Sequence, residues 1–372
     1  MTMNNQAVTG AKHQRVAQSE LPSYLEFFAG SGLVAHGLKQ HFKAIWANDI
    51  CEKKAAVYQA NHGQEHFHMG SITDVKGNDL PVAPLSWASF PCQDLSLAGL
   101  IAGIEGARSG LVWEWLRVMD EMETMPAVLV AENVTGLISL DGGSQYRMLH
   151  EALRTRGYLV GAIHLDAIHW VPHSRPRVFV IAVKEAVDVP VSLLAGGPTW
   201  LHSKAVVTAA NGLDGWLWWN LPIPKPRQID LADIIDWTAD CDDAEKSARN
   251  VAMIPDKHRA LLKAAKLAVA PGYKRTRASK QVLELRFDGV AGCLRTPKGG
   301  SSRQFLVLKR GNELATRLLT VRETARLMGA PETFQLPGTY NDGYKAMGDA
   351  VAVPCAHFLA QNLLGPLMKV AQ

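Results

Sequence analysis

The sequence predicts an α/β protein with a doubly wound, mostly parallel β-sheet and a second, smaller, irregular domain. In the first half of the 372 residues, short β-rich runs alternate with amphipathic stretches, as in sheets that are covered by helices. After Val183 this alternation stops, and glycines, prolines and the WLWW cluster at 216–219 follow. Helical patterns return from Thr320 onwards. With 47% apolar residues, a chain of this length can bury a large core and is expected to divide into two domains.

The elements of the first half are expected to alternate between strand and helix. A strand at 24–29 (YLEFFA) precedes a helix at 33–42, and a strand at 43–48 (KAIWAN) precedes a helix at 51–61. The chemical motifs described below follow such strands, which is the side where open α/β sheets bind ligands. The later elements are a strand at 85–90, a helix near 111–122, and strands at 127–131, 159–165 and 178–183.

The same patterns divide the chain into four segments. The stretch Thr320-Val-Arg-Glu323 is typical of a capping box at the start of a helix in the last segment. The segments are a flexible N-terminal tail at 1–21, the first part of the larger domain at 22–189, the smaller domain at 190–315, and helices that return to the larger domain at 316–372.

Positive charge is concentrated in one part of the chain. Between Lys257 and Arg310, fourteen Lys and Arg oppose only Glu284 and Asp288, a net charge of +12. Because the whole chain carries +4, the remainder carries −8. Such asymmetry favours a surface that meets a polyanion, with nucleic acid as the first candidate. A solvated basic face with its counter-charges nearby is the alternative.

Cysteine usage and hydropathy predict a cytoplasmic protein. The first twenty residues are polar and lack the apolar region of a secretory signal. No segment approaches the roughly 18 apolar residues that a membrane span requires. The cysteines are odd in number and scattered without a CxxC pair, which favours reduced thiols over disulfides. They are Cys51, Cys92, Cys241, Cys293 and Cys355.

Cys92 directly follows a proline at the end of the predicted strand 85–90. Free cysteine often fills a core as a small apolar residue. Pro91, however, restricts the backbone and favours a turn, and ligands bind at strand ends in open α/β sheets. On this stretch alone, a functional thiol and a core thiol both remain open.

A glycine loop and a strand-end acid favour a nucleoside-containing cofactor. In Phe27-Phe-Ala-Gly-Ser-Gly32, Gly30 and Gly32 allow a tight turn, so that a ligand can approach amides at the helix start. Asp49 ends the next strand, where a carboxylate can accept hydrogen bonds from ribose hydroxyls. A plain tight turn is the alternative for the glycines alone. The third glycine of GxGxxG is missing, which argues against a nicotinamide cofactor.

Two further motifs place charge beside predicted strands. Glu132 follows the apolar run 127–131, where burial would raise its pKa and allow it to donate a proton near neutrality. A carboxylate that caps a neighbouring helix is the alternative. Arg175 and Arg177 precede the strand at 178–183 and, in extended chain, would share one face and clamp a phosphate or a planar polar group. A surface arginine pair is the alternative.

The order of these motifs resembles that of the cytosine-5 DNA methyltransferases of bacteria and phages. The resemblance covers about 24–183 and 320–364, more than half of the chain. It implies a Rossmann-like, S-adenosylmethionine-dependent methyltransferase fold, in which 190–315 is the DNA-recognition domain and the rest is catalytic. The motifs are the glycine loop, the strand-end acid, Pro91-Cys92-Gln93, Glu132-Asn133-Val134, Arg175-Pro-Arg177 and Gly348-Asp349-Ala350-Val351.

The resemblance implies a reaction and the residues that carry it. A methyl group passes from S-adenosylmethionine to carbon 5 of a cytosine that is flipped out of a specific duplex sequence. The thiolate of Cys92 adds to carbon 6 and makes carbon 5 nucleophilic, while Glu132 protonates or hydrogen-bonds ring nitrogen 3. Arg177, with Arg175 nearby, would hold the carbonyl oxygen. No metal is expected.

The resemblance also implies the cofactor site and shows where this chain departs from the family. Ser71 stands where an acid often contacts the adenine, and His173 stands where glutamine usually begins the Arg-x-Arg motif. Asp349 and Ala350 replace the usual asparagine and serine. The expected cofactor residues are Phe28, Ala29, Gly30, Ser31, Gly32, Asp49, Ile50, Ser71, Ile72, Pro91, Leu111, Asp349, Ala350 and Val351.

The recognition segment that the resemblance implies coincides with the basic stretch found from charge alone. The loop 295–303 combines basic residues with glycine and serine, and can follow a phosphate backbone. Trp216, Trp218 and Trp219 either face bases or form the core of the smaller domain, and the core is favoured. DNA contacts are expected from Gln93, Ser96, Arg108, Arg295, Lys298 and Arg303.

Three alternative functions explain the sequence less well than a DNA cytosine-5 methyltransferase. An RNA (transfer RNA) cytosine-5 methyltransferase is disfavoured because the long recognition segment suits duplex DNA. A thiol-dependent, nucleotide-binding oxidoreductase leaves the Glu132 motif and the basic stretch unexplained. A non-catalytic DNA-binding relative would lack Cys92 or Glu132, and both are present. We expect an active, monomeric enzyme in the cytoplasm of a bacterium or phage-infected host, with double-stranded DNA as its partner, no membrane, and a cognate restriction endonuclease as a further partner.

Overall fold

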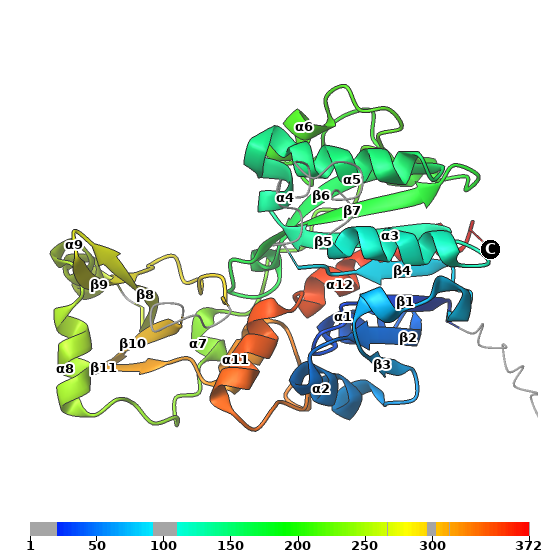
Figure 1. Ribbon diagram of the computed structural model, residues 1–372. Helices are drawn as coiled ribbons and strands as arrows, with labels where there is room; N and C mark the ends of the chain where they lie inside the picture. Colours follow the sequence, from blue (N-terminus) through cyan, green and yellow to red (C-terminus); the bar gives the residue numbers. More distant parts are fainter. Residues whose placement is uncertain (1–20, 92–109, 266, 296–302, 312, 372) are drawn as a thin grey trace, which may run out of the picture.

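The computed structural model describes residues 21–91, 110–265, 267–295, 303–311 and 313–371. The strands of its larger sheet are β1 (Ser23–Phe27), β2 (Lys43–Asp49), β3 (Phe67–Met69), β4 (Leu85–Ala88), β5 (Val128–Val134), β6 (Tyr158–Asp166) and β7 (Pro176–Lys184). They form a seven-stranded sheet in the order β3-β2-β1-β4-β5-β7-β6 (Figure 1). All pairs are parallel except those of β7 with β5 and β6, so the prediction of a mostly parallel sheet is confirmed.

Helices cover both faces of this sheet. The α-helices of the described residues, of which α8 and α9 lie away from this sheet, are α1 (Leu33–Leu38), α2 (Glu52–His62), α3 (Leu111–Glu121), α4 (Gly136–Ser139), α5 (Ser144–Arg154), α6 (Lys204–Ala210), α7 (Leu231–Ile234), α8 (Ala244–Ala252), α9 (Asp256–Ala264), α10 (Val321–Leu327), α11 (Tyr340–Asp349), α12 (Val353–Leu359) and α13 (Gly365–Met368). α1 and α12 share a core with one face, whereas α3 and α5 share a core with the other. In β5, Val130 faces the first core and Leu129 the second, which explains why this strand is apolar throughout.

The strand order reverses between β1 and β4, the position where open α/β sheets bind ligands. Because β7 is antiparallel to β5, the first residues of β7 lie at the carboxyl ends of the parallel strands. Arg177, near the start of β7, therefore pairs with Val134 at the end of β5. Glu132 lies within β5 rather than after it, since the strand continues past the apolar run that predicted it.

Residues around the tryptophan cluster extend the larger sheet. The segment at 215–217 hydrogen-bonds to the edge of β6, and Trp216 forms a β-bridge with Val160. Trp219 is buried against Gly161, where a Cβ atom would lie 2.5 Å from the indole nitrogen. The prediction that these tryptophans form the core of the smaller domain is therefore wrong, because they pack on the larger sheet.

A second sheet projects from the larger one (Figure 1). Its strands are β8 (Val269–Arg277), β9 (Lys280–Leu285), β10 (Gln304–Arg310) and β11 (Glu313–Leu318). They form an antiparallel sheet in the order β11-β10-β8-β9, with α8 and α9 beside it. A small cluster that includes Ile254, Leu283 and Val307 forms its core. This part is more regular than predicted, because basic residues on the solvent side obscure its strand pattern.

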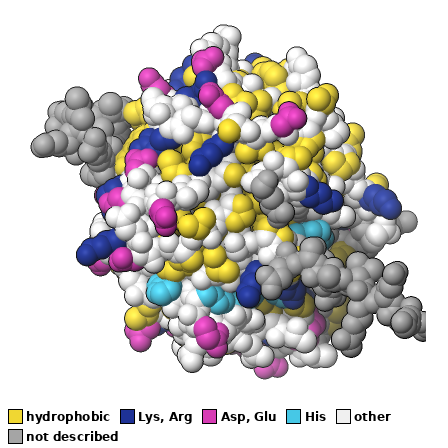
Figure 2. All heavy atoms as spheres, turned by 90° about the vertical axis from the view of Figure 1, so that its right-hand side faces the viewer, with side chains coloured by type: hydrophobic (Ala, Val, Ile, Leu, Met, Phe, Trp, Pro, Cys, Tyr) yellow, Lys and Arg dark blue, Asp and Glu magenta, His cyan; other side chains and the backbone are white. Residues whose placement is uncertain are grey.

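The charge of the second sheet is only partly neutralised within it. Glu284 and Asp288, the acids of the basic stretch, form ion pairs with Arg277 and Arg286. Figure 2 shows the end of the molecule away from this sheet, where acidic and basic side chains are interspersed. The structure thus places the basic excess around the smaller sheet.

The C-terminal segment returns to the larger sheet as predicted. Thr320 and Glu323 form the expected capping box at the start of α10. In the described part of the chain, one helical run, Tyr340–Met368, is long and apolar enough to cross a membrane, and most of it is buried in the molecule. α12, in the middle of this run, packs on α1, while α11, at its beginning, forms part of the site described next.

Candidate active site

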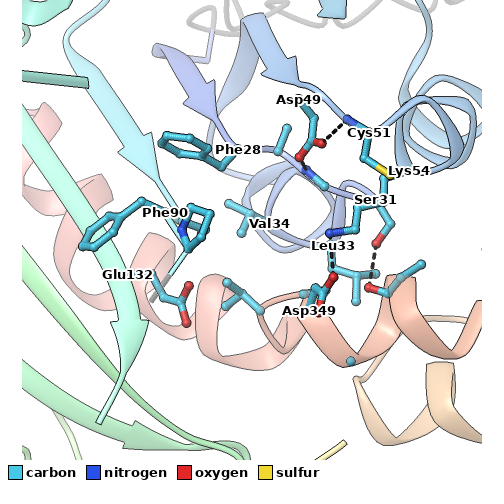
Figure 3. A pocket seen from close by; sticks show the side chains of 18 of the residues that line it. Phe28, Ser31, Leu33, Val34, Asp49, Cys51, Lys54, Phe90, Glu132 and Asp349 are labelled. Atoms are coloured by element: carbon cyan, nitrogen blue, oxygen red, sulfur yellow. Dashed lines mark hydrogen bonds and ion pairs between the residues drawn. The ribbon is translucent and has the colours of Figure 1, made fainter. Parts of the chain in front are cut away.

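A cavity of about 720 Å³ opens at the carboxyl edge of the larger sheet (Figure 3). Cys92 lies outside the described residues, directly after Pro91, which lines this cavity. The structure brings all but one of the predicted cofactor residues to the cavity wall. Those that line it are Phe28, Ala29, Gly30, Ser31, Asp49, Ile50, Ser71, Ile72, Pro91, Leu111, Asp349, Ala350 and Val351.

The loop after β1 turns sharply and is held by Asp49. Phe28 has a φ of 56°, a conformation that residues other than glycine rarely adopt. One carboxylate oxygen of Asp49 accepts a hydrogen bond from the Gly30 amide, and the other accepts one from the Cys51 amide, both at 2.8 Å. A carboxylate has about four acceptor positions, so Asp49 can still accept hydrogen bonds from hydroxyl groups in the cavity.

Gly32 does not line the cavity; it packs against His62 of α2, on the side of the loop away from the cavity. A Cβ atom on Gly32 would lie 2.6 Å from the His62 imidazole, and its φ of 82° also favours glycine. His62 Nε2 donates to the Gly32 carbonyl at 2.8 Å. Burial lowers the pKa of His62 to about 4, so the ring is neutral at pH 7. No sequence motif had marked His62.

Ser71 and Ile50 lie in the wall beyond Asp49. The Ser71 hydroxyl caps a short turn by accepting a hydrogen bond from the Thr73 amide at 3.3 Å, and it also bonds the Thr73 hydroxyl. Ile50 is 72% exposed although it is a large apolar residue. An exposed apolar surface at the rim of a cavity suits the face of a planar ring.

Glu132 and Arg177 form an ion pair in the part of the wall nearest Pro91. Arg177 Nε lies 3.0 Å from Glu132 Oε1, and both side chains are largely buried. They are neighbours because β5 and β7 pair Glu132 with Phe179 and Val134 with Arg177, so the two charged residues lie diagonally on one face. The pair therefore presents a carboxyl group and a guanidinium side by side.

Burial controls the protonation of Glu132. It raises the pKa of this carboxyl group, while Arg177, Arg175 and a hydrogen bond from Ser89 oppose the rise. The Ser89 hydroxyl accepts a hydrogen bond from the Trp87 indole at 3.0 Å, which leaves its proton for Glu132. The predicted upward shift is confirmed, and it favours a form of Glu132 that can donate a proton.

Arg175, which was predicted to be catalytic, does not line the cavity, and its catalytic role remains a prediction. Its guanidinium is buried and donates to the carbonyl oxygens of Gly348 at 2.8 Å, Ala350 at 2.5 Å and Leu294 at 3.2 Å. Arg175 and Arg177 do not form the expected clamp for a ligand, because carbonyl groups of residues distant in the sequence bind Arg175. Arg175 instead holds together two segments of the cavity wall.

Asn133 ties β5 to the turn before Cys92. Its side-chain amide donates to the Phe90 carbonyl at 3.0 Å and accepts from the Val134 amide at 2.8 Å. The Glu-Asn-Val motif thus contributes an acid to the cavity and a support to the Phe90-Pro91 turn.

His173 serves packing rather than the cavity. It is fully buried, and its two ring nitrogens bond the Leu327 carbonyl at 3.1 Å and the Leu294 amide at 3.2 Å. Burial lowers the pKa of His173 well below its usual range, so the ring remains neutral. His173, at the first position of the Arg-x-Arg motif, therefore joins the start of this motif to α10 and to Leu294.

The predicted DNA-binding residues are only partly described. Gln93, Ser96, Arg108 and Lys298 lie outside the described residues. Arg295 is exposed and lines the cavity. Arg303 bonds the Asn341 side chain at 2.5 Å and lies over the Tyr340 ring. Sequence reasoning missed several wall residues, which carry no motif of their own: Lys54, Ser89, Cys293 and Lys345.

The sheet order and the cavity define an α/β protein with a candidate ligand site at the switch point of the sheet. The family model for C-5 cytosine-specific DNA methylases matches residues 23–212 and 225–365. The chain belongs to this family.

Relatives with known names agree with this assignment, and a solved structure shares the fold. The chain is 25% identical over 342 residues to the type II methyltransferase M.Bsp6I of Bacillus sp. (strain RFL6), covering 90% of this chain and 96% of that one. It is 24% identical over 374 residues to M.MspI of Moraxella sp, covering 98% and 76%. The S. pombe Dnmt2 methyltransferase shares the fold with a TM-score of 0.61 at 17% identity, covering 94% of this chain and 98% of that one.

Proposed function

We propose that this chain is an S-adenosylmethionine-dependent DNA (cytosine-5-)-methyltransferase that acts on a flipped-out cytosine through a covalent Cys92 adduct. The observation that carries the proposal is the buried Glu132–Arg177 pair, which lines the same cavity as Pro91, the residue before Cys92. A carboxyl donor beside a guanidinium matches two neighbouring acceptors on the edge of cytosine, ring nitrogen 3 and the carbonyl oxygen on carbon 2.

Each residue of this group has a role in the proposed reaction. The Cys92 thiolate adds to carbon 6, and the electrons of the ring double bond move so that carbon 5 becomes nucleophilic. Glu132, whose pKa burial raises, donates to nitrogen 3 as negative charge builds there. Arg177 holds the carbonyl oxygen. Carbon 5 takes up the methyl group, with release of S-adenosylhomocysteine. A base then removes the carbon-5 proton and nitrogen 3 returns its proton to Glu132, which expels the thiolate and restores the ring.

The residues around the rest of the cavity fit the cofactor. When bound, S-adenosylmethionine supplies the electrophilic methyl group. Asp49 offers acceptor positions for ribose hydroxyls, Ile50 offers an apolar surface for the adenine, and the glycine loop lets the ligand approach closely. Ser71 lines the cavity at the position where the family often has an acid that contacts the adenine.

The proposed substrate is duplex DNA, read by the smaller basic sheet and the loops beside it. The positive excess around β8 to β11 supports this assignment. The four segments of the chain, the monomeric state, the cytoplasmic location and a cognate restriction endonuclease remain predictions. The names of the relatives as type II methyltransferases favour the last of these.

Bisulfite sequencing tests the proposal. The chain is expressed in a bacterial host without DNA methylation, and genomic DNA and transfer RNA are sequenced after bisulfite treatment. We expect 5-methylcytosine at one DNA sequence context with the unaltered chain and none with Cys92→Ser, since a hydroxyl is a far weaker nucleophile. Methylation confined to RNA, or retained in Cys92→Ser, would contradict the proposal.

A further inference from the structure

An ion pair between two helices lines the candidate cofactor cavity. Lys54 Nζ lies 2.7 Å from Asp349 Oδ2, and both residues belong to the cavity wall. Lys54 is in the first turn of α2, and Asp349 is the last residue of α11. Neither charge is fully buried, with side chains 17% and 28% exposed, so both are within reach of a ligand.

The two charges occupy helix ends that do not favour them. The amino end of a helix carries partial positive charge and stabilises anions, whereas the carboxyl end stabilises cations. Lys54 stands at an amino end and Asp349 at a carboxyl end, so each opposes the dipole of its own helix. Each helix end would instead be stabilised by a ligand group of the charge opposite to that of its side chain. The arrangement thus suits an anion beside Lys54 and a cation beside Asp349.

The place of the pair in the cavity indicates which part of a cofactor it meets. Asp49 and Ile50 line the part assigned to adenosine, and Glu132 lines the part where the base would react. Figure 3 shows Asp349 on the other side of the glycine loop from Asp49. The Ser31 hydroxyl also donates to the Ala346 carbonyl at 3.3 Å, which holds this loop against α11.

We propose that Lys54 and Asp349 recognise the α-amino-acid group of S-adenosylmethionine by exchanging partners. On binding, the ion pair opens, the ligand ammonium pairs with Asp349, and the ligand carboxylate pairs with Lys54. The proposal rests on the proposed function, since it presumes this cofactor, and it adds Lys54 to the site. It also gives a role to the aspartate that replaces the usual asparagine of the family motif.

The competing explanation is that the pair only joins α2 to α11. The chain offers a matched control for this explanation, because Lys53 and Asp342 join the same two helices at 2.9 Å. That pair lies outside the cavity, and the Lys53 side chain is 68% exposed. A purely structural role predicts similar effects for the two lysines.

Calorimetric titration with two ligands tests the proposal. S-adenosylhomocysteine carries the amino-acid group, whereas 5′-methylthioadenosine has the same nucleoside and thioether without it. For Lys54→Met we expect about ten- to hundredfold weaker binding of S-adenosylhomocysteine, the loss typical of a charge-assisted hydrogen bond, and unchanged binding of 5′-methylthioadenosine. For Lys53→Met we expect both affinities to remain unchanged.

A charge-swapped variant, Lys54→Asp with Asp349→Lys, provides the second arm. It can restore an ion pair between the helices, but it offers the ligand reversed charges, so we expect it to bind only 5′-methylthioadenosine well. Unchanged binding of S-adenosylhomocysteine by Lys54→Met, or equal losses for both ligands, would overturn the proposal. If the unaltered protein binds neither ligand, the cofactor assignment itself is wrong.

Discussion

Glu26 is a buried acid at the centre of the larger sheet whose charge state depends on pH. It is 1% exposed in β1 and accepts a hydrogen bond from the Tyr24 hydroxyl at 3.0 Å. Burial raises the pKa of Glu26 to about 8. Its protonated form is therefore favoured by folding, and this contribution to stability is present below about pH 4.5 and is lost as pH rises through about 8.

We therefore predict that Glu26→Gln makes folding less sensitive to alkaline pH. The amide is close in shape to the protonated acid and cannot ionise. At pH 9 the variant should exceed the unaltered protein in free energy of unfolding by about 4 kcal/mol, and the difference should be small at pH 5. Urea unfolding of both proteins at the two pH values measures this. Equal differences at both pH values would contradict the assigned pKa.

Single residues also show where prediction from the sequence succeeds and where it stops. The raised pKa of Glu132 was predictable because a carboxyl group inside an apolar strand must be buried. The sequence could not assign different roles to Arg175 and Arg177, because the carbonyls that bind Arg175 come from distant positions, 294, 348 and 350. No sequence motif marked Lys54 as a site residue, because only the fold brings it to Asp349.

At the level of elements, a buried ion pair joins β11 to α10. Arg317 donates to both carboxylate oxygens of Glu323, at 2.7 and 2.6 Å, and Glu323 also accepts from the amides of Thr320 and Asp236. The Glu323 side chain is fully buried. Losing one partner of such a pair leaves the other charge buried and uncompensated.

We predict that Glu323→Gln lowers the free energy of unfolding by about 3 kcal/mol, measured by urea unfolding. The control is Glu284→Gln, which breaks the Arg277–Glu284 pair between β8 and β9. Because Arg277 is 63% exposed in that pair, its loss should cost less than about 1 kcal/mol. Similar losses in the two variants would refute the structural importance of the buried pair.

Elements with strong local patterns were predictable, and others were not. The apolar runs of β1, β4 and β5 and the capping box of α10 identified their elements. β3 is only three residues long and two of them are exposed, so it leaves no pattern. The direction of β7 depends on a short connection from β6 that carries one 3-10 turn, Ala167–His169, and no α-helix. The alternating pattern gave no sign of this connection.

For the whole molecule, the basic residues of the segment 295–303 should contribute to DNA binding through phosphate contacts. We predict that alanine at Arg295, Lys298 or Arg303 weakens binding to target and non-target duplexes alike, and reduces the salt dependence of affinity by about one unit of slope for each contact. The control is Arg277→Ala, because Arg277 is paired with Glu284 at the far end of β8. Affinities at several salt concentrations measure this, and an unchanged slope in all three variants would move DNA contact elsewhere.

The central claim, a covalent cytosine adduct on Cys92, is tested most directly by trapping. A duplex that contains the target sequence with 5-fluorocytosine is incubated with the protein and S-adenosylmethionine, because fluorine at carbon 5 blocks the final elimination. The proposed mechanism predicts a stable protein–DNA adduct that mass spectrometry maps to Cys92 and that is absent from Cys92→Ser. An adduct on another thiol, such as Cys293 in the cavity wall, or no adduct at all, would contradict it.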